Sequence, residues 1–281
     1  RRQRQMCIRD RPRVNWDTTF SQESTLTQAD WLGDRAQHHP NRIAVVDAAS
    51  HRRHSFRGFD NRANQIAHFC DQWVGLLPGD CSGLLSLPSD DVLQIVVAAG
   101  KLGLTALLLD PAASPDALIA TINQLGPRTL YHGLAQADLV QEIWFEVDSV
   151  EQVIPLRGAV DTANFEDIVA HYPPILPSID REGEVPWLHF AAEGITWADL
   201  EAVAAHTSPD DRPDRVAAPI YRPDGLAAAL LALQAGQGVV VEFDSVEIIK
   251  SPGEISPTEE PEAGSQRNVP TGRSWLPHEF H

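Results

Sequence analysis

The sequence predicts an α/β protein with a mostly parallel sheet flanked by helices. Short apolar runs alternate with helical patterns along the chain, and the run "TALLLD" is apolar throughout, as in a strand buried on both faces. Apolar side chains make up 43% of the 281 residues. That share supports a sizeable core and argues against a wholly disordered chain.

The first predicted elements are a helix, a hairpin and a second helix. A short helix is expected over 27–39, with Thr27 as its N-cap. A β-hairpin formed by 42–47 and 54–56 is expected next. An amphipathic helix over 58–74 follows, because five apolar side chains recur at steps of four and three residues. These side chains are Phe59, Ala63, Ile66, Cys70 and Trp73.

The next segments alternate between strand and helix, which favours a parallel sheet covered by helices. A Ser-Asp-Asp cap begins the first of the two helices at Ser89, and "SPD" starts the second at Ser114. The strands are expected over 81–87, 105–110 and 128–131, and the helices over 89–102 and 114–125.

A second alternation follows a less regular stretch. That stretch contains a short helix over 164–171 and a Pro-rich connection, "YPPILPSID", which resists helix formation. Strands are then expected over 187–190, 215–219 and 238–243, and helices over 196–205 and 226–235.

The two ends of the chain differ from the body. Residues 1–13 begin with "RRQRQMCIRDR", which resembles translated library-adapter sequence, so we treat them as a non-native leader. The alternative is a basic arm that binds nucleic acid or a membrane surface. Residues 251–281 are polar and rich in proline, and they are predicted to be a disordered tail.

The body, residues 14–250, is predicted to be one α/β domain. Its two βα halves, 14–135 and 184–250, are joined by the irregular segment 136–183.

The net charge of −17 restricts the partners of the protein. It argues against a non-specific nucleic-acid or anionic-membrane partner. Only Lys101 and Lys250 are lysines among 22 basic residues, and an acidic chain with few lysines is typical of a high-salt cytoplasm. A GC-rich genome also favours Arg over Lys, but it does not account for the acidity. We therefore expect a cytoplasmic, halophilic protein.

Several short motifs occur in a fixed order within 27–131, and weaker matches return within 186–244. The motifs are "HPNRIAVVD", "RANQIAHF", "PGD", "LPSDDVLQIVVAAGKLG" and "LLLDP". Together they resemble the N-terminal part of the adenylate-forming (AMP-binding) enzymes, which include the acyl-CoA synthetases. The resemblance implies an acid–thiol ligase that uses ATP with Mg²⁺ and CoA. The matched motifs belong to the scaffold of that family and carry no catalytic residue.

The phosphate-binding loop of the family is degenerate in this sequence. In the family this loop is rich in Ser, Thr and Gly and ends in Lys, whereas here the segment reads "FAAEGIT". Gly194 and Thr196 remain, no Lys follows, and Glu193 adds a negative charge. Phosphate binding needs converging backbone N–H groups and a cation. We therefore expect neither a bound cofactor nor a catalytic residue in this chain.

A second family motif is partly kept. The family turn Pro-x-Phe-His-x-x-Gly lies near the acyl and nucleotide pockets, and here Pro219, Tyr221, Arg222 and Gly225 occupy its positions. Arg222 replaces the histidine and adds a permanent charge. By this resemblance Tyr221, Arg222 and Gly225 are candidate remnants of a substrate pocket.

Other candidate residues favour structural roles. The basic run His51–His54 is either an anion site or, as we favour, a solvated turn. Cys70 lies on an apolar helix face and is expected in the core, and Asp90 and Asp91 are expected to cap a helix. No metal site is expected, because the cysteines have no zinc spacing and His278–His281 lacks a supporting helix.

The sequence therefore predicts a member of this family that cannot form an adenylate alone and that binds a small acyl ligand or a partner chain. The alternative is one part of a split acyl-CoA synthetase that acts together with a separate chain.

Overall fold

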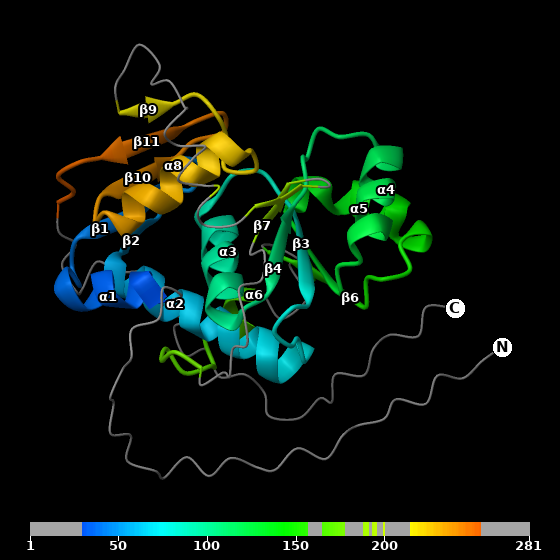
Figure 1. Cartoon of the computed structure of the whole chain (residues 1–281), viewed down its shortest axis with the longest axis horizontal. Coiled ribbons are helices and arrows are strands. Elements are labelled where there is room, and N and C mark those ends of the chain that lie inside the picture. The colour runs from blue at the N-terminus through cyan, green and yellow to red at the C-terminus, as the bar shows by residue number, and fades with distance from the viewer. Residues whose placement is uncertain are drawn as a thin grey trace, which may run out of the picture.

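Two β-sheets enclose a layer of helices in this protein (Figure 1). The computed structural model describes residues 30–156, 165–177, 188–190, 193–195, 199 and 214–253. The predicted α/β fold with a mostly parallel sheet flanked by helices is confirmed. The leader 1–13 and nearly all of the predicted tail lie outside the described residues.

The first sheet has five strands in the order β2-β1-β10-β11-β9. β1 and β10 are parallel, with Val45 opposite Val239, and the other pairs are antiparallel. The predicted hairpin is confirmed as β1 and β2, whereas β11 was not predicted. The strands are β1 (Ile43–Asp47), β2 (Arg53–Ser55), β9 (Arg215–Val216), β10 (Gly238–Val241) and β11 (Val246–Ile249).

The second sheet has six strands in the order β6-β5-β3-β4-β7-β8. Every neighbouring pair is parallel except β7 and β8, which are antiparallel. The strands are β3 (Cys81–Leu85), β4 (Thr105–Leu108), β5 (Thr129–His132), β6 (Gln152–Pro155), β7 (Leu188–Phe190) and β8 (Glu193–Ile195).

Three of the helices begin at a serine cap. Ser55, Ser89 and Ser114 each accept a hydrogen bond from the backbone N–H three residues later, which satisfies a donor of the first turn. The helices are α1 (Trp31–His38), α2 (Phe56–Phe69), α3 (Asp90–Leu102), α4 (Pro115–Leu125), α5 (Ala137–Ile143), α6 (Phe165–Val169) and α8 (Pro223–Gln234).

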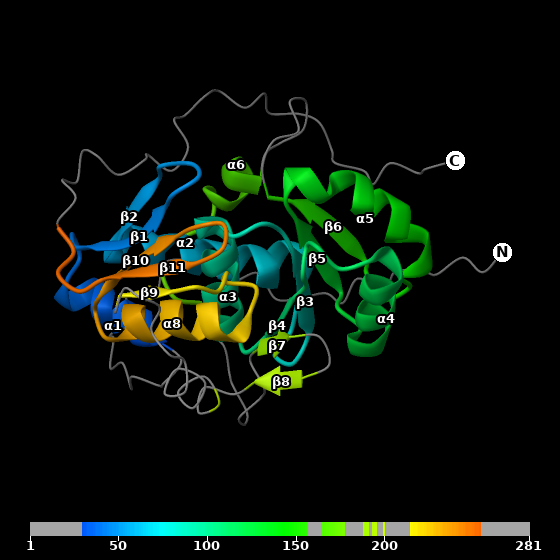
Figure 2. The same ribbon diagram turned by 90° about the horizontal axis from the view of Figure 1, so that it is seen from above.

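The main core lies between the two sheets. Helices α2, α3 and α8 contribute fully buried side chains to it, among them Phe59, Val96 and Leu230. Each such side chain stabilises the fold by about 1.5–3 kcal/mol relative to exposure. A second core lies on the far face of the six-stranded sheet, where α4 and α5 cover Leu107 and Leu130 (Figure 2).

The two predicted βα halves are interleaved in both sheets. β1, from the first half, pairs with β10 from the second, and β4 pairs with β7 in the same way. Neither sheet can therefore be completed by one half of the sequence.

Helix α2 differs from the prediction at its end. It starts at Phe56, and after Phe69 it widens into a π-helical turn, Cys70–Val74, that ends at Gly75 in the left-handed conformation. The wider turn moves Trp73 off the apolar face, so its side chain is 51% exposed instead of buried. The other four residues predicted on that face are buried.

Candidate functional site

A two-stranded hairpin occupies the position predicted for the degenerate phosphate loop. β7 and β8 are antiparallel, and Phe190 is paired directly with Glu193. Only Ala191 and Ala192 therefore connect the two strands. The next pair in the ladder is His189 with Gly194, so the backbone of Gly194 belongs to the sheet.

This pairing leaves few backbone N–H groups that could bind an anion. A phosphate loop turns several consecutive N–H groups toward one point, whereas Glu193 and Gly194 are aligned with β7 as strand residues. Thr196, the third residue predicted at this loop, lies outside the described residues.

Tyr221 and Arg222 form the turn that leads into α8. The Arg222 N–H donates to the Pro219 carbonyl at 2.9 Å, and the Leu226 N–H donates to the Arg222 carbonyl at 3.0 Å. Arg222 is the N-cap residue, and its side chain makes no capping bond and is exposed. The turn thus presents the guanidinium of Arg222 at the start of the helix.

Gly225 allows this turn to fold back tightly on α8. A Cβ atom at this position would lie 2.3 Å from the Ala218 carbonyl oxygen and 2.4 Å from the Pro219 carbonyl oxygen. Both distances are far shorter than any real carbon–oxygen contact, and both partners are backbone. The turn that holds Tyr221 and Arg222 therefore requires glycine at 225.

Asp110 joins these residues at the carboxyl end of β4. Partial burial raises the pKa of the Tyr221 hydroxyl, the negative charge of Asp110 raises it further, and the positive charge of Arg222 opposes them. The structure therefore brings Tyr221 and Arg222 together with an acidic residue that sequence reasoning missed. Its position two residues after a buried parallel strand was an available signal, because ligands of parallel sheets bind at that edge.

The hairpin and this turn belong to the same edge of the sheet. β4 and β7 are parallel neighbours with Leu108 opposite Phe190, so Asp110 and the hairpin both follow the carboxyl ends of their strands. Phe190 and Tyr221 both pack against the main core. The resulting site offers an exposed cation and a protonated phenol, which suits the binding of a carboxylate.

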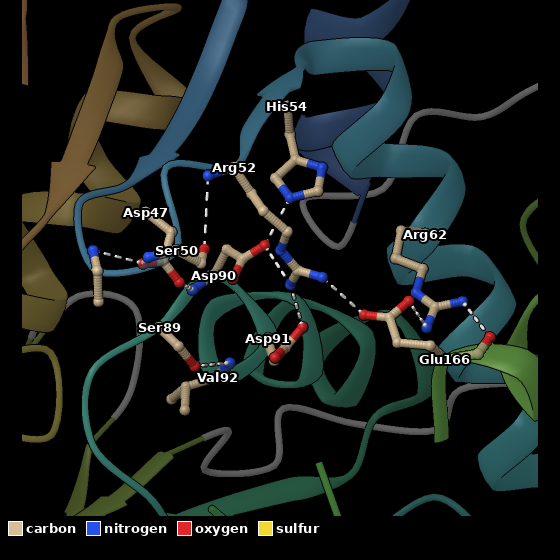
Figure 3. A network of polar contacts seen from close by, with 11 residues as sticks. Asp47, Ser50, Arg52, His54, Arg62, Ser89, Asp90, Asp91, Val92 and Glu166 are labelled. Atoms are coloured by element: carbon tan, nitrogen blue, oxygen red, sulfur yellow. Dashed lines mark hydrogen bonds and ion pairs between the residues drawn. The ribbon is translucent and has the colours of Figure 1, made fainter. Parts of the chain in front are cut away.

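A buried polar network lies on the hairpin turn of the first sheet (Figure 3). Arg52 donates to Asp90 at 2.5 Å, to Asp91 at 2.6 Å and to Glu166 of α6 at 2.9 Å. His54 Nε2 lies 2.6 Å from the same Asp90 carboxylate. The interpretation of this basic run as a solvated turn is therefore wrong for Arg52 and His54, although His51 and Arg53 are exposed.

The network holds its carboxylates in the ionised form. Burial alone would raise the pKa of Asp90, but hydrogen bonds from His54 and Arg52 outweigh it and lower the pKa. Burial also opposes ionisation of Glu166, and the charges of Arg62 and Arg52 lower its pKa in the same way. Carboxylates with lowered pKa values stay ionised near neutral pH, so Asp90 and Glu166 present fixed negative charges to the cations around them.

The remaining predicted residues have structural positions or lie outside the described residues. Cys70 is buried, its Sγ lies 3.1 Å from the Tyr131 hydroxyl, and burial raises the pKa of its thiol to about 12. Asp90 and Asp91 lie in the first turn of α3, but the cap is Ser89. His278–His281 are not described.

Two further properties concern the described part of the chain as a whole. It contains no group of three or more His, Cys, Asp and Glu side chains arranged to hold a metal ion. None of its helices combines the length and the apolar character that a bilayer crossing requires.

The sequence and the fold both match known proteins. A family model described as AMP-binding enzyme matches residues 32–221. The N-terminal domain of FACL13 from Mycobacterium tuberculosis has a TM-score of 0.64 and 16% identity, over 77% of this chain and 57% of that chain. A putative long-chain-fatty-acid CoA ligase from Rhodopseudomonas palustris has a TM-score of 0.62 and 20% identity, with the same coverage.

A third similar structure is a long-chain-fatty-acid-CoA ligase from Archaeoglobus fulgidus, with a TM-score of 0.64 and 15% identity. The match covers 79% of this chain and 47% of that one. The present chain thus spans about half the length of these proteins. At such low identities the likeness shows the fold and does not show the reaction.

Proposed function

Because the chain belongs to the AMP-binding enzyme family, we propose that it is a member that does not form an adenylate by itself and that binds a small carboxylic acid or acyl ligand. The pairing of Phe190 with Glu193 carries this proposal. It leaves two residues where the family places its phosphate loop, and the chain has no lysine near this position. The residues present do not fit the phosphates of ATP, so no reaction step is assigned to ATP, Mg²⁺ or CoA.

The turn before α8 supports a binding role. Arg222 offers a permanent positive charge, and Tyr221 is protonated at neutral pH even with the ordinary tyrosine pKa of 10.0, which burial and Asp110 raise further. A carboxylate can accept hydrogen bonds from both groups, while Asp110 disfavours a second negative charge beside them. A ligand with one carboxylate is therefore favoured over a nucleotide.

Pyrophosphate exchange tests the missing reaction. The purified chain, incubated with ATP, Mg²⁺ and a panel of carboxylic acids at molar salt, is expected to give no exchange above background. Calorimetry under the same conditions is expected to give no ATP binding. Exchange with any acid, or measurable ATP affinity, would overturn the proposal.

Calorimetry with the same acids tests the binding role. Arg222→Ala is expected to weaken binding of the acid about tenfold, the loss of roughly one charge-assisted hydrogen bond. Arg53→Ala removes another exposed arginine, in β2, and serves as the matched control. Equal affinities of the two variants would remove Arg222 from the site.

A split acyl-CoA synthetase is the second candidate. The match covers 57% of the FACL13 N-terminal domain, and this candidate assigns the remainder of that fold to a separate chain. A separate chain would then have to supply both the phosphate loop and the catalytic lysine. Pyrophosphate exchange that appears only when the product of a neighbouring reading frame is added would support this candidate.

The cytoplasmic, salt-adapted setting is part of the proposal. The net charge of −17 supports it, because salt screens repulsion between carboxylates. The midpoint of thermal unfolding is expected to rise between 0.1 M and 2 M KCl, and an unchanged midpoint would contradict salt adaptation.

A further inference from the structure

Exposed apolar side chains gather around the C-terminal end of α2. Trp73 and Leu77 are 51% and 52% exposed, and Ile175 and Leu176 are 53% and 40% exposed. These four residues, which we call the Trp73 patch, are half of the large apolar side chains exposed in the described part of the chain. Apolar patches of this kind mark surfaces that bind something.

Side chains of helix α2 contact both parts of the patch. One part is Trp73 and Leu77, and the other is Ile175 and Leu176 in the segment after α6. The ring of Phe69 stacks on Trp73 at 5.0 Å between centroids and meets the ring of Tyr172 edge-on at 6.1 Å. His68 Nε2 lies 3.0 Å from the carbonyl oxygen of Ile175.

Two further side chains of α2 fix the same segment. Asn64 donates to the Pro174 carbonyl and Gln65 donates to the Tyr172 carbonyl, at 3.2 and 3.0 Å. The exposed side chains therefore stand on a backbone that is fixed by several hydrogen bonds, and their exposure is a feature of the fold.

We propose that the tail segment Trp275–Phe280 of this same chain covers the Trp73 patch. This segment lies outside the described residues, and its sequence is "WLPHEF". It carries three of the five large apolar residues that follow Gly253. The five are Ile255, Val269, Trp275, Leu276 and Phe280.

Only the last part of the tail differs in charge from the rest of the protein, because 254–281 as a whole carries five glutamates and two arginines, for a net −3. Side chains of 267–281 include two arginines and one glutamate, for a net +1, whereas the whole chain carries −17. Asp71 lies two residues before Trp73, next to the patch. The stretch 267–281 is therefore attracted to the acidic protein, whereas 254–266, with four glutamates, is repelled.

The length of the tail matches the distance it has to span. Ile43 donates its N–H to the Gly253 carbonyl at 2.8 Å, and Phe56 at the start of α2 donates to Arg42, so Gly253 lies close to that end of α2. Trp73 is 17 positions further along the helix, a rise of about 26 Å. The 21 residues between Gly253 and Trp275 have a root-mean-square length of about 25 Å as a flexible chain. A linker whose length equals the span gives an effective concentration in the millimolar range.

Site-specific crosslinking tests the contact directly in the full chain. p-Benzoylphenylalanine at position 280 is expected, after irradiation, to form an intramolecular crosslink to peptide 68–79 or peptide 165–177. A crosslink between two chains would assign the patch to a second copy and overturn the proposal. Crosslinks elsewhere in the chain, or none, would also overturn it.

Hydrogen exchange provides a second measurement. The double variant Trp275→Ser/Phe280→Ser is expected to exchange roughly tenfold faster in peptides 68–79 and 165–177. This factor is the protection given by a tail with an effective concentration of about 1 mM that binds the patch with a Kd of about 0.1 mM. Val269→Ser, in the same tail but outside the segment, is the matched control and is expected to leave exchange unchanged. Equal exchange in all three proteins would refute the docked tail. Neither measurement depends on ATP or on an acyl ligand, so failure here is distinguishable from failure of the proposed function.

Discussion

Phe190 and Glu193 face each other as a pair across β7 and β8, with two residues between them in the sequence. Two-residue connections between antiparallel strands favour turns whose central residues have positive φ. This pairing characterises the candidate site better than any single residue does. It fixes the number of residues between the two strands at the position where a phosphate would have to bind.

The first prediction concerns this connection. Replacing Ala191 and Ala192 by Asn and Gly, the pair preferred in two-residue hairpins, is expected to stabilise the protein by about 0.5 kcal/mol. Urea denaturation at fixed salt measures the change. Ala112→Gly, in an exposed loop, is the control and is expected to destabilise slightly. Destabilisation by the Asn-Gly pair would mean that the segment is not a tight hairpin.

The second prediction concerns Gly225. In an ordinary helix, Gly→Ala stabilises by about 0.5–1 kcal/mol, but here the new Cβ would overlap two backbone carbonyl oxygens. Gly225→Ala is therefore expected to destabilise the protein by about 1–3 kcal/mol in urea denaturation. Asp224→Ala changes the exposed neighbour and is expected to stay within about 0.5 kcal/mol. A stabilised Gly225→Ala variant would show that the turn can relax without loss.

The third prediction compares two adjacent arginines. Arg52→Met leaves three carboxylates without their shared cation, so the free energy of unfolding is expected to fall by about 3–5 kcal/mol. Arg53→Met changes the exposed side chain of the next residue and is expected to cost no more than about 0.5 kcal/mol. Similar losses in the two variants would contradict the burial of the network.

The fourth prediction concerns pH. Asp90 and Glu166 have folded pKa values below their ordinary values of 3.8 and 4.5. Their contribution to stability is therefore complete above about pH 5.5 and is lost as the pH falls through 4.5 and 3.8 toward the lower folded values. Denaturation midpoints measured from pH 7 to pH 3 are expected to fall in that window. Glu166→Gln should flatten the decline, and an unchanged slope would mean that Glu166 is not held ionised.

The fifth prediction compares the two lysines of the chain. Lys101 is buried, with its Nζ 2.5 Å from Asp30 and 2.8 Å from Asp60, whereas Lys250 pairs with Asp214 at the surface. Lys101→Met leaves two neighbouring carboxylates without compensation, and we expect a loss of about 3–5 kcal/mol. Lys250→Met should cost no more than about 1 kcal/mol. Thermal unfolding of both variants decides the comparison, and near-equal midpoints would argue against the buried pair.

Local signals in the sequence were sufficient for most of the fold. Helices begin after Ser89 and Ser114, as predicted, and the alternation of strand and helix from 81 to 132 is confirmed. These features depend on neighbouring residues only, so the sequence shows them directly. Trp73 was placed wrongly, because a π-helical turn shifts the helical period after Phe69.

Contacts between residues far apart in the sequence were harder to predict. The sequence did not show that Arg52 would meet Asp90 and Glu166, because the partners are 38 and 114 positions away. The residues of the candidate site were predicted only in part: Tyr221, Arg222 and Gly225 came from a motif, whereas Asp110 required knowledge of which strands are neighbours. The register of β7 and β8 likewise depends on pairing that local patterns do not specify.

The parallel pairing of Val45 with Val239 has a consequence for biosynthesis. On the ribosome, β1 has no parallel partner until about 190 further residues have been made, which takes roughly 10–40 s at ordinary rates of translation. In the six-stranded sheet, one edge of β4 has no strand partner until β7 has been made. Strand β10 of the first sheet is made later still. The nascent chain therefore carries an incomplete first sheet until β10 and β11 have been made.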